Sequence, residues 1–340
     1  MILEKKTKSG LIILILLILI VFTLFFINNN ISHQRILPSN SNINSAPVTN
    51  NTHFDKSQVQ NYKNKYIAAL YIEGQISEEN VDYSQKWLLS TIRALKNDKN
   101  NEAIALFINS PGGAVYQADE AYLALQDYKT TGKPIYVYQG PMAASGGYYI
   151  SCASDQIYAN RNTLTGCIGV ISGTTFDMSE FLNNLGIKAE TIHSGKNKNM
   201  MNFNEPFTDE QKDIMQSISD ECYEQFVSIV ANARKMSYKQ AADLSDGRLY
   251  TAKQALENGL IDRIDSWENM IGHLSEKIEK PGIKVKTFKK ERKTNFFDLV
   301  TGKTKQLSDM IVAEKIGLPV EIVNQMNEKR IEPKYLFPGY

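Results

Sequence analysis

Hydrophobic residues in the middle of the chain follow a strand-like pattern and a helix-like pattern in turn. Continuous apolar runs occupy residues 66–74, 103–108 and 135–138, as expected for strands buried on both faces of a parallel sheet. Between these runs, residues 81–95 carry apolar side chains at spacings of three and four, and residues 115–128 form a second predicted helix. This order predicts an α/β fold built from parallel βαβ units.

Two glycine-rich turns follow the second and third predicted strands. Residues 109–113 read NSPGG, and residues 140–147 read GPMAASGG and lead into a segment with helical character. In parallel sheets, sites form where the strands end, so the two turns are expected to face one another.

Ser145 lies where the third strand turns into this helix. Unpaired N–H groups at a helix start can stabilise an oxyanion, so Ser145 is a candidate nucleophile. Gly113 and Gly146 are the candidate oxyanion donors. For this stretch taken alone, a glycine-rich turn with an incidental serine is the alternative.

A serine nucleophile needs a base, and the residues alone leave two kinds open. His193 precedes a polar loop that holds Lys196 and Lys198, and a neutral lysine can also accept the proton. His273 lies in an amphipathic stretch and is expected on a helix surface. Solvated surface charges are the alternative for both lysines.

An apolar run of about 17 residues, 11–27, predicts a membrane anchor. As a helix it spans about 26 Å, near the lower limit for crossing a bilayer. It is longer than the core of a signal peptide, and no small-x-small cleavage site follows it, so we expect no cleavage. Three lysines, Lys5, Lys6 and Lys8, precede the run and none stands just after it. This asymmetry predicts a cytoplasmic N-terminus and a body outside the membrane.

Composition narrows the function further. A net charge of +1 gives no electrostatic reason to expect nucleic acid as a partner. The three cysteines, Cys152, Cys167 and Cys222, are too few and too scattered for a disulfide framework or a metal site. We therefore expect no metal and no cofactor.

Five motifs resemble those of the signal peptide peptidase A (SppA) family, membrane-anchored Ser/Lys peptidases of bacteria, in its short single-domain form. They are NSPGG (109–113), MAASGGYYIS (142–151), TGCIGV (165–170), SGKNK (194–198) and DGRLYTAKQALENGLID (246–262). The resemblance implies a Clp protease/crotonase-like repeated βαβ fold, together with an N-terminal transmembrane helix.

The resemblance also implies roles for individual residues. Ser145 would be the nucleophile, Lys198 the general base, and Gly113 and Gly146 the oxyanion donors. Lys196 falls at a variable position of the motif.

One site position departs from the family pattern. The family usually has a serine that helps to hold the lysine amine where this chain has Cys167. A thiol is a weaker hydrogen-bond partner, so Ser172 is a second candidate for positioning the lysine. Arg161 and Asn162 also replace a usual Pro-Gly pair, in a loop that is not expected to take part in the chemistry.

The implied function is that of a serine endopeptidase that degrades remnant signal peptides and other peptides at the outer face of the membrane. The family forms ring-like homo-oligomers whose sites draw on neighbouring subunits, and an octamer is one candidate. Two alternatives stay open, a catalytically dead membrane scaffold and a crotonase-like acyl-CoA enzyme, and Cys167 is the one hint toward the scaffold.

The expected organisation of the chain has five parts. They are a cytoplasmic N-terminus (1–9), a transmembrane anchor (10–27), a flexible stalk (28–62), a Ser/Lys peptidase domain (63–280) and a C-terminal extension (281–340). In the extension, residues 284–293 are basic and 295–316 are expected to be helical. The final apolar residues, 334–340, are hypothesised to enter a substrate groove, where they would regulate the enzyme or be trimmed by it.

Overall fold

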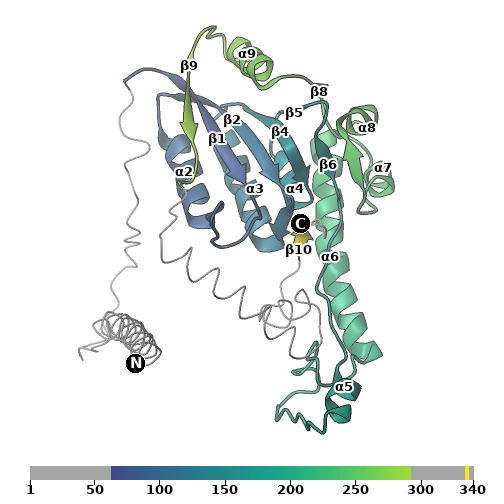
Figure 1. Ribbon diagram of the computed structural model, residues 1–340. Coiled ribbons are helices and arrows are strands. Elements are labelled where there is room, and N and C mark those ends of the chain that lie inside the picture. Colours follow the sequence, from purple (N-terminus) through teal and green to yellow (C-terminus); the bar gives the residue numbers. More distant parts are fainter. Residues whose placement is uncertain (1–62, 292–333, 337–340) are drawn as a thin grey trace, which may run out of the picture. The chain divides into compact units, whose positions relative to one another are not determined.

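The computed structural model describes residues 63–291 and 334–336, and these form a mixed α/β fold around one large sheet (Figure 1). The strands of this sheet are β1 (Tyr66–Glu73), β2 (Asn101–Ser110), β4 (Ile135–Ala144), β5 (Gln156–Ala159), β6 (Leu164–Gly166), β7 (Leu249–Thr251), β8 (Arg263–Ile264) and β9 (Lys284–Phe288). Their order is β7-β6-β4-β2-β1-β9, and β5 joins β4 to β8. Strands β3 (Gly112–Ala114) and β10 (Lys334–Leu336) form a separate two-stranded sheet.

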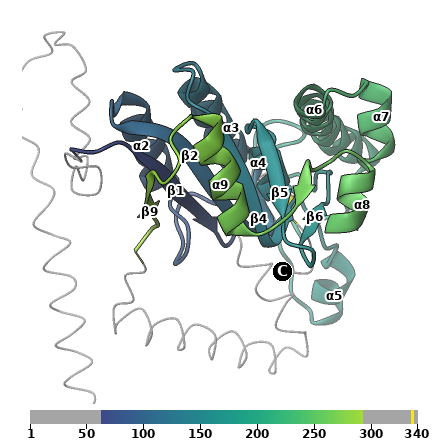
Figure 2. The ribbon, with the colours of Figure 1, turned by 90° about the horizontal axis from the view of Figure 1, so that it is seen from above.

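Helices cover both faces of the large sheet (Figure 2). The helices are α2 (Gln85–Asn97), α3 (Val115–Lys129), α4 (Gly146–Ser151), α5 (Ser179–Asn184), α6 (Asp209–Arg234), α7 (Tyr238–Asp243), α8 (Ala252–Glu257) and α9 (Trp267–Lys277). In β2, Ile104, Leu106 and Ile108 pack in the core beneath α2, α3 and α4, whereas Ala103 and Ala105 pack with α9. This alternation follows from the period of two in a strand and explains why β2 is apolar throughout.

The predicted βαβ order is confirmed, because β1, β2, β4 and β5 pair in parallel. The prediction of a helix over 81–95 was wrong at its start, since α2 begins at Gln85. The Asn80 side chain accepts hydrogen bonds from the N–H groups of Asp82 and Tyr83 and holds a turn there. Ser84 then caps the helix by accepting a bond from the Trp87 N–H.

Two strands differ from the sequence predictions. The strand expected at 135–138 continues to Ala144, because its end pairs with β6 as well as with β2. Residues 284–288, noted in the sequence only for their charge, form strand β9 at the edge of the sheet beside β1. Edge strands tolerate lysines, which is why no apolar run marked this strand.

Several expectations concern parts of the chain outside the described residues. These are the anchor at 10–27, the stalk at 28–62 and the helix at 295–316. Among the helices that are described, none combines the length and the hydropathy needed to cross a bilayer.

The C-terminal end of α6 is joined to the sheet by a largely buried ion pair. The Arg234 guanidinium donates to the Gly259 carbonyl at 2.7 Å and to both oxygens of Asp262 at 2.7 and 3.0 Å. The same Asp262 carboxylate accepts a hydrogen bond from the Ile157 N–H at the start of β5. This contact therefore fixes α6 against the strand that follows α4.

We expect Arg234→Met to lower the free energy of unfolding by about 3–5 kcal/mol, because it leaves the Asp262 carboxylate unpaired in a partly buried position. Urea denaturation followed by circular dichroism measures this loss. Lys239→Met is the matched control, since Lys239 forms an exposed pair with Asp243 and should cost at most about 0.5 kcal/mol. Equal losses in the two variants would contradict a structural role for the Arg234 pair.

Candidate active site

Ser145 stands at the junction between β4 and α4 in a strained backbone conformation. Its φ and ψ are 52° and −115°, a region that a residue with a side chain rarely adopts and that costs roughly 1–3 kcal/mol. Two hydrogen bonds hold it there. The Ser145 N–H donates to the Gly166 carbonyl at 2.7 Å, and its carbonyl accepts from the Tyr149 N–H at 2.9 Å. The side chain is 1% exposed, at the point where the sequence placed the nucleophile.

Strand β6 supports this junction from one side. Thr165 pairs with Ala143, and its hydroxyl donates to the Ala143 carbonyl at 2.8 Å. Gly166 has φ +82°, and a Cβ on this residue would lie 2.6 Å from the Tyr250 ring. Tyr250 of β7 therefore packs directly against the residue whose carbonyl holds Ser145.

The end of β2 supports the junction from the other side. Ser110 pairs with Ala143, and its hydroxyl accepts a hydrogen bond from the Gly112 N–H at 3.1 Å. A Cβ on Gly147 would lie 3.0 Å from the Ser110 carbonyl oxygen, so α4 and β2 meet at backbone distance. The two glycine-rich turns are thus brought together, as the sequence predicted.

Gly113 is held on one side by the backbone of Ile76. The Ile76 N–H donates to the Gly112 carbonyl at 2.8 Å, and the Ala114 N–H donates to the Ile76 carbonyl at 3.0 Å. A Cβ on Gly113 would lie 1.8 Å from the Ile76 oxygen, so no other residue fits. Because backbone groups alternate along a strand, the N–H and carbonyl of Gly113 point to the opposite edge of β3.

That opposite edge carries strand β10. Tyr335 pairs with Gly113 in an antiparallel register, with Lys334 opposite Ala114 and Leu336 opposite Gly112. Helix α4, which begins at Gly146 directly after Ser145, contacts both β3 and β10. The C-terminal residues 334–336 therefore lie as an extended strand beside both glycine turns.

Comparisons with known proteins identify the family of this chain. The model of peptidase family S49 matches residues 127–281. A Synechocystis sp. protein named "Putative protease slr0021" is 33% identical over 205 residues, which cover 60% of this chain and 72% of that protein. The chain belongs to peptidase family S49. An Enterococcus faecium relative named "Putative signal peptide peptidase SppA" is 36% identical over 221 residues, which cover 63% of this chain and 64% of that protein.

The other similarities are partial in length or in structure. The chain spans less than two thirds of the length of the Enterococcus faecium relative. A solved structure of a ClpP1 mutant from Listeria monocytogenes covers 60% of this chain and 94% of its own, with a TM-score of 0.41 and 19% identity. A score of this size does not assign the fold, so the Clp protease/crotonase type stays a prediction.

No hydrogen bond joins Lys198, the S49 chain's predicted base, to Ser145 in the described structure. Ser145 Oγ has no hydrogen-bond partner among the described residues. Lys198 is exposed in the segment between α5 and α6, and Figure 1 shows α5 at the far end of a segment that extends away from the sheet. Lys196, nearby, forms an ion pair with Glu210.

Neither histidine takes the place of the lysine. His193 is exposed in the same segment, and its Nδ1 lies 3.1 Å from the Gly195 carbonyl. His273 was expected on a helix surface, but it is half-buried and its Nδ1 lies 3.1 Å from the Tyr158 hydroxyl, since α9 packs on the sheet there. Among the described residues, neither a lysine nor a histidine is hydrogen-bonded to Ser145 Oγ.

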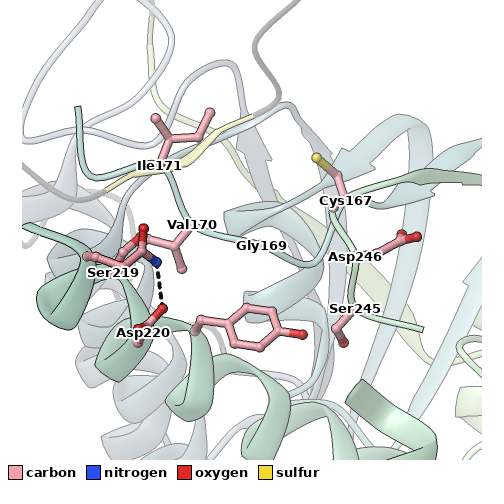
Figure 3. A pocket seen from close by; sticks show the side chains of 11 residues that line it. Cys167, Gly169, Val170, Ile171, Ser219, Asp220, Ser245 and Asp246 are labelled. Atoms are coloured by element: carbon pink, nitrogen blue, oxygen red, sulfur yellow. Dashed lines mark hydrogen bonds between the residues drawn. The ribbon is translucent and has the colours of Figure 1, made fainter. Parts of the chain in front are cut away.

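Cys167 and Ser172, the candidates for positioning the lysine, lie in the segment after β6, beside two cavities. Cys167 lines a cavity of about 460 Å³ that also exposes Asp220 and Asp246 (Figure 3). Ser172 lines an adjoining cavity of about 450 Å³, and its hydroxyl has no hydrogen-bond partner among the described residues. Cys167 has φ +51°, and its N–H donates to the Arg248 carbonyl at 2.8 Å.

The sequence did not identify several supports of this site. Thr165, Gly166 and Tyr250 were recognised only as parts of motifs, and Ile76 carried no chemical signal. Ile76 and Gly166 act through backbone atoms, and residue type reports little about such contacts. For metals, residues 63–291 contain no cluster of three or more His, Cys, Asp or Glu side chains that could hold an ion.

Burial sets the reactivity of the cysteines. It raises the pKa of Cys167 to about 11 and that of Cys152 to about 12, whereas Cys222 is only partly buried. The thiolate is the reactive form, so burial lowers the reactivity of Cys167 and Cys152. We expect iodoacetamide at pH 8 to modify Cys222 first and the other two only on unfolding, as read by peptide mass mapping. Rapid modification of Cys167 in the folded protein would contradict this order.

Proposed function

We propose that this chain is a serine endopeptidase in which Ser145 attacks the carbonyl of a peptide bound as an added strand. The observation that carries the proposal is the pairing of β10 with β3 at Gly113, next to the helix that begins after Ser145. An extended peptide on this edge is recognised mainly by backbone hydrogen bonds. Such recognition suits an enzyme that accepts peptides of different sequence.

Two backbone N–H groups support the attack. The Gly113 N–H points to the edge where the peptide lies, and the Gly146 N–H is the first of α4, without an intrahelical acceptor. Together they would hold the oxyanion formed when Ser145 Oγ attacks. One such donor typically contributes roughly 10²–10³ in rate.

We infer that Lys198 of a neighbouring copy provides the base. Ser145 Oγ lacks a partner among the described residues of its own chain, and the segment carrying Lys198 exposes apolar side chains that a single copy leaves in water: Leu185 (59% exposed), Ile187 (49%) and Ile192 (95%). Apolar surface of this kind is typical of protein interfaces. A ring-like homo-oligomer, with an octamer as one candidate, would bury it and complete each site.

The cavity beside Cys167 gives the incoming amine a place to lie. Its lining includes Cys167, Val170 and Ile171, which follow Gly166 in the chain, and the Asp246 carboxylate in it is paired with Arg248. Neutral Lys198 would take the Ser145 proton and give it to the leaving amine as the peptide C–N bond breaks, and water would later hydrolyse the acyl-enzyme. Cys167 and Ser172 would orient the amine, the thiol more weakly than the serine that the family usually has.

The proposed substrates are remnant signal peptides and other peptides at the outer face of the membrane. The apolar run at 11–27 would anchor the chain, and one relative carries the name of a signal peptide peptidase. Regulation or trimming by the C-terminal tail stays a prediction.

Labelling with a fluorophosphonate probe tests the proposed chemistry. We expect the wild type to be labelled on Ser145, Ser145→Ala not to be labelled, and Lys198→Ala to be labelled at least about 10²-fold more slowly, because the serine loses its base. Lys196→Ala is the matched control and should label normally, since its amine pairs with Glu210. An unlabelled wild type would favour the scaffold or the acyl-CoA enzyme. Normal labelling of Lys198→Ala would show that Lys198 is not the base.

Co-expression of two inactive variants tests whether the site is shared. A ring that mixes Ser145→Ala and Lys198→Ala subunits at random should recover about a quarter of the wild-type peptidase activity, because that fraction of interfaces joins an intact serine to an intact lysine. Purified mixed oligomers with tagged subunits provide the measurement, and each variant expressed alone is the control. No recovery in mixed oligomers would mean that both groups act within one chain.

A further inference from the structure

The loop between β1 and α2, residues 74–84, runs along the edge of β3 opposite to β10. Its residue Ile76 is fully buried and pairs with Gly113 as an isolated parallel bridge. Glycine at 113 lets the two backbones approach closely, as the 1.8 Å distance from a hypothetical Cβ to the Ile76 oxygen shows. The loop is therefore the outer support of the strand that carries a proposed oxyanion donor.

One hydrogen bond in this support fixes the direction of that donor. The Ile76 N–H donates to the Gly112 carbonyl at 2.8 Å. The Gly112 carbonyl and the Gly113 N–H belong to the same planar trans peptide and point in opposite directions. Holding the carbonyl toward Ile76 therefore directs the Gly113 N–H toward the peptide-binding edge.

The Asn80 side chain holds the Ile76 segment in place. Its Nδ2 donates to the Gln75 carbonyl at 2.7 Å and to the Ser77 hydroxyl at 2.8 Å, one on each side of Ile76. Its Oδ1 accepts from the N–H groups of Asp82 and Tyr83 at 2.9 and 2.8 Å. Both amide protons and both acceptor positions of Asn80 are thus used to close the loop.

The loop is also fastened to β9 and α2. Lys290, just after β9, donates to the carbonyls of Asn80 and Tyr83 and forms an ion pair of 2.8 Å with Glu79. The Ser84 hydroxyl, at the start of α2, donates to the same Glu79 carboxylate. Asn80 therefore connects the part of the loop that is held by Lys290 and Ser84 to the Ile76 segment.

We propose that Asn80 is a positioning residue for catalysis, which holds the segment around Ile76 so that the Gly113 N–H is directed at the oxyanion. This inference rests on the proposed function of Gly113. Asn80 itself does not touch the peptide. Its effect passes through two hydrogen bonds to the segment and then through the peptide plane between Gly112 and Gly113.

Asn80→Asp in the full-length chain, purified in detergent, separates the hydrogen bonds that the Asn80 amide donates from those that its oxygen accepts. Aspartate keeps an oxygen for the N–H groups of Asp82 and Tyr83, but it removes both donated bonds and places an oxygen against the Gln75 carbonyl. We expect kcat to fall by roughly tenfold or more, because loss of a whole oxyanion donor costs about 10²–10³. KM should change less than about threefold, since an interaction made only in the transition state is lost.

A peptide aldehyde gives a second measurement, because its adduct with Ser145 carries an oxyanion. Its inhibition constant should rise by the same factor as kcat falls, whereas binding of the matching peptide acid should be unchanged. Asn258→Asp is the matched control, since the Asn258 amide donates to the Gln254 carbonyl in an exposed position at the end of α8. Both variants should unfold at similar temperatures.

Hydrogen exchange measured by mass spectrometry tests whether Asn80 holds the Ile76 segment, and it needs no activity assay. Peptides that contain Ile76 and Ala114 should exchange faster in Asn80→Asp than in the wild type, and unchanged exchange would overturn the inference even if the chain were no peptidase. With an active wild type, an unchanged kcat in Asn80→Asp would also overturn it. So would a fall in kcat that only matches a loss of folded protein.

Discussion

The parallel pairing of β2 with β4 is the constraint on which the candidate site depends. Its last contact joins Ser110 to Ala143, so the NSPGG turn and the turn at Ser145 leave the sheet side by side. Close backbone approach follows, and a Cβ on Gly147 would lie 3.0 Å from the Ser110 carbonyl oxygen, a tight contact that glycine avoids. Without this register, the strained serine and the proposed glycine donors would belong to separate turns.

The site combines a rigid part with an exposed part. Ser145, Gly146 and Gly113 are buried and are held by hydrogen bonds from β6, α4 and the Ile76 segment. Lys198 instead lies in an exposed segment with unburied apolar side chains. Backbone strain at a residue such as Ser145 persists only where the surrounding structure holds it firmly. A base that enters the site of another copy must instead lie on an exposed segment. The proposed assembly would join the two parts.

Strand β3 pairs with a different segment along each of its two edges. The Ile76 segment occupies one edge, and β10 occupies the other. Because the two groups of a peptide unit point in opposite directions, the packing of the first edge sets the orientation of donors on the second. In this way a loop that never meets the peptide can influence how the peptide is bound.

Local patterns in the sequence determined the parallel βαβ order, the two glycine turns and the place of Ser145, because strand period, helix period and turn residues each leave a local signature. The resemblance to a peptidase family depended on the same contiguous motifs. The tertiary structure decided what no local pattern records. It showed that Gly166 and Ile76 hold the site through backbone atoms and that residues 284–288 form an edge strand. It also showed that Ser145 Oγ has no hydrogen-bond partner in the described chain. Backbone hydrogen bonds between distant segments depend on register and close approach, and amino-acid type specifies these only indirectly.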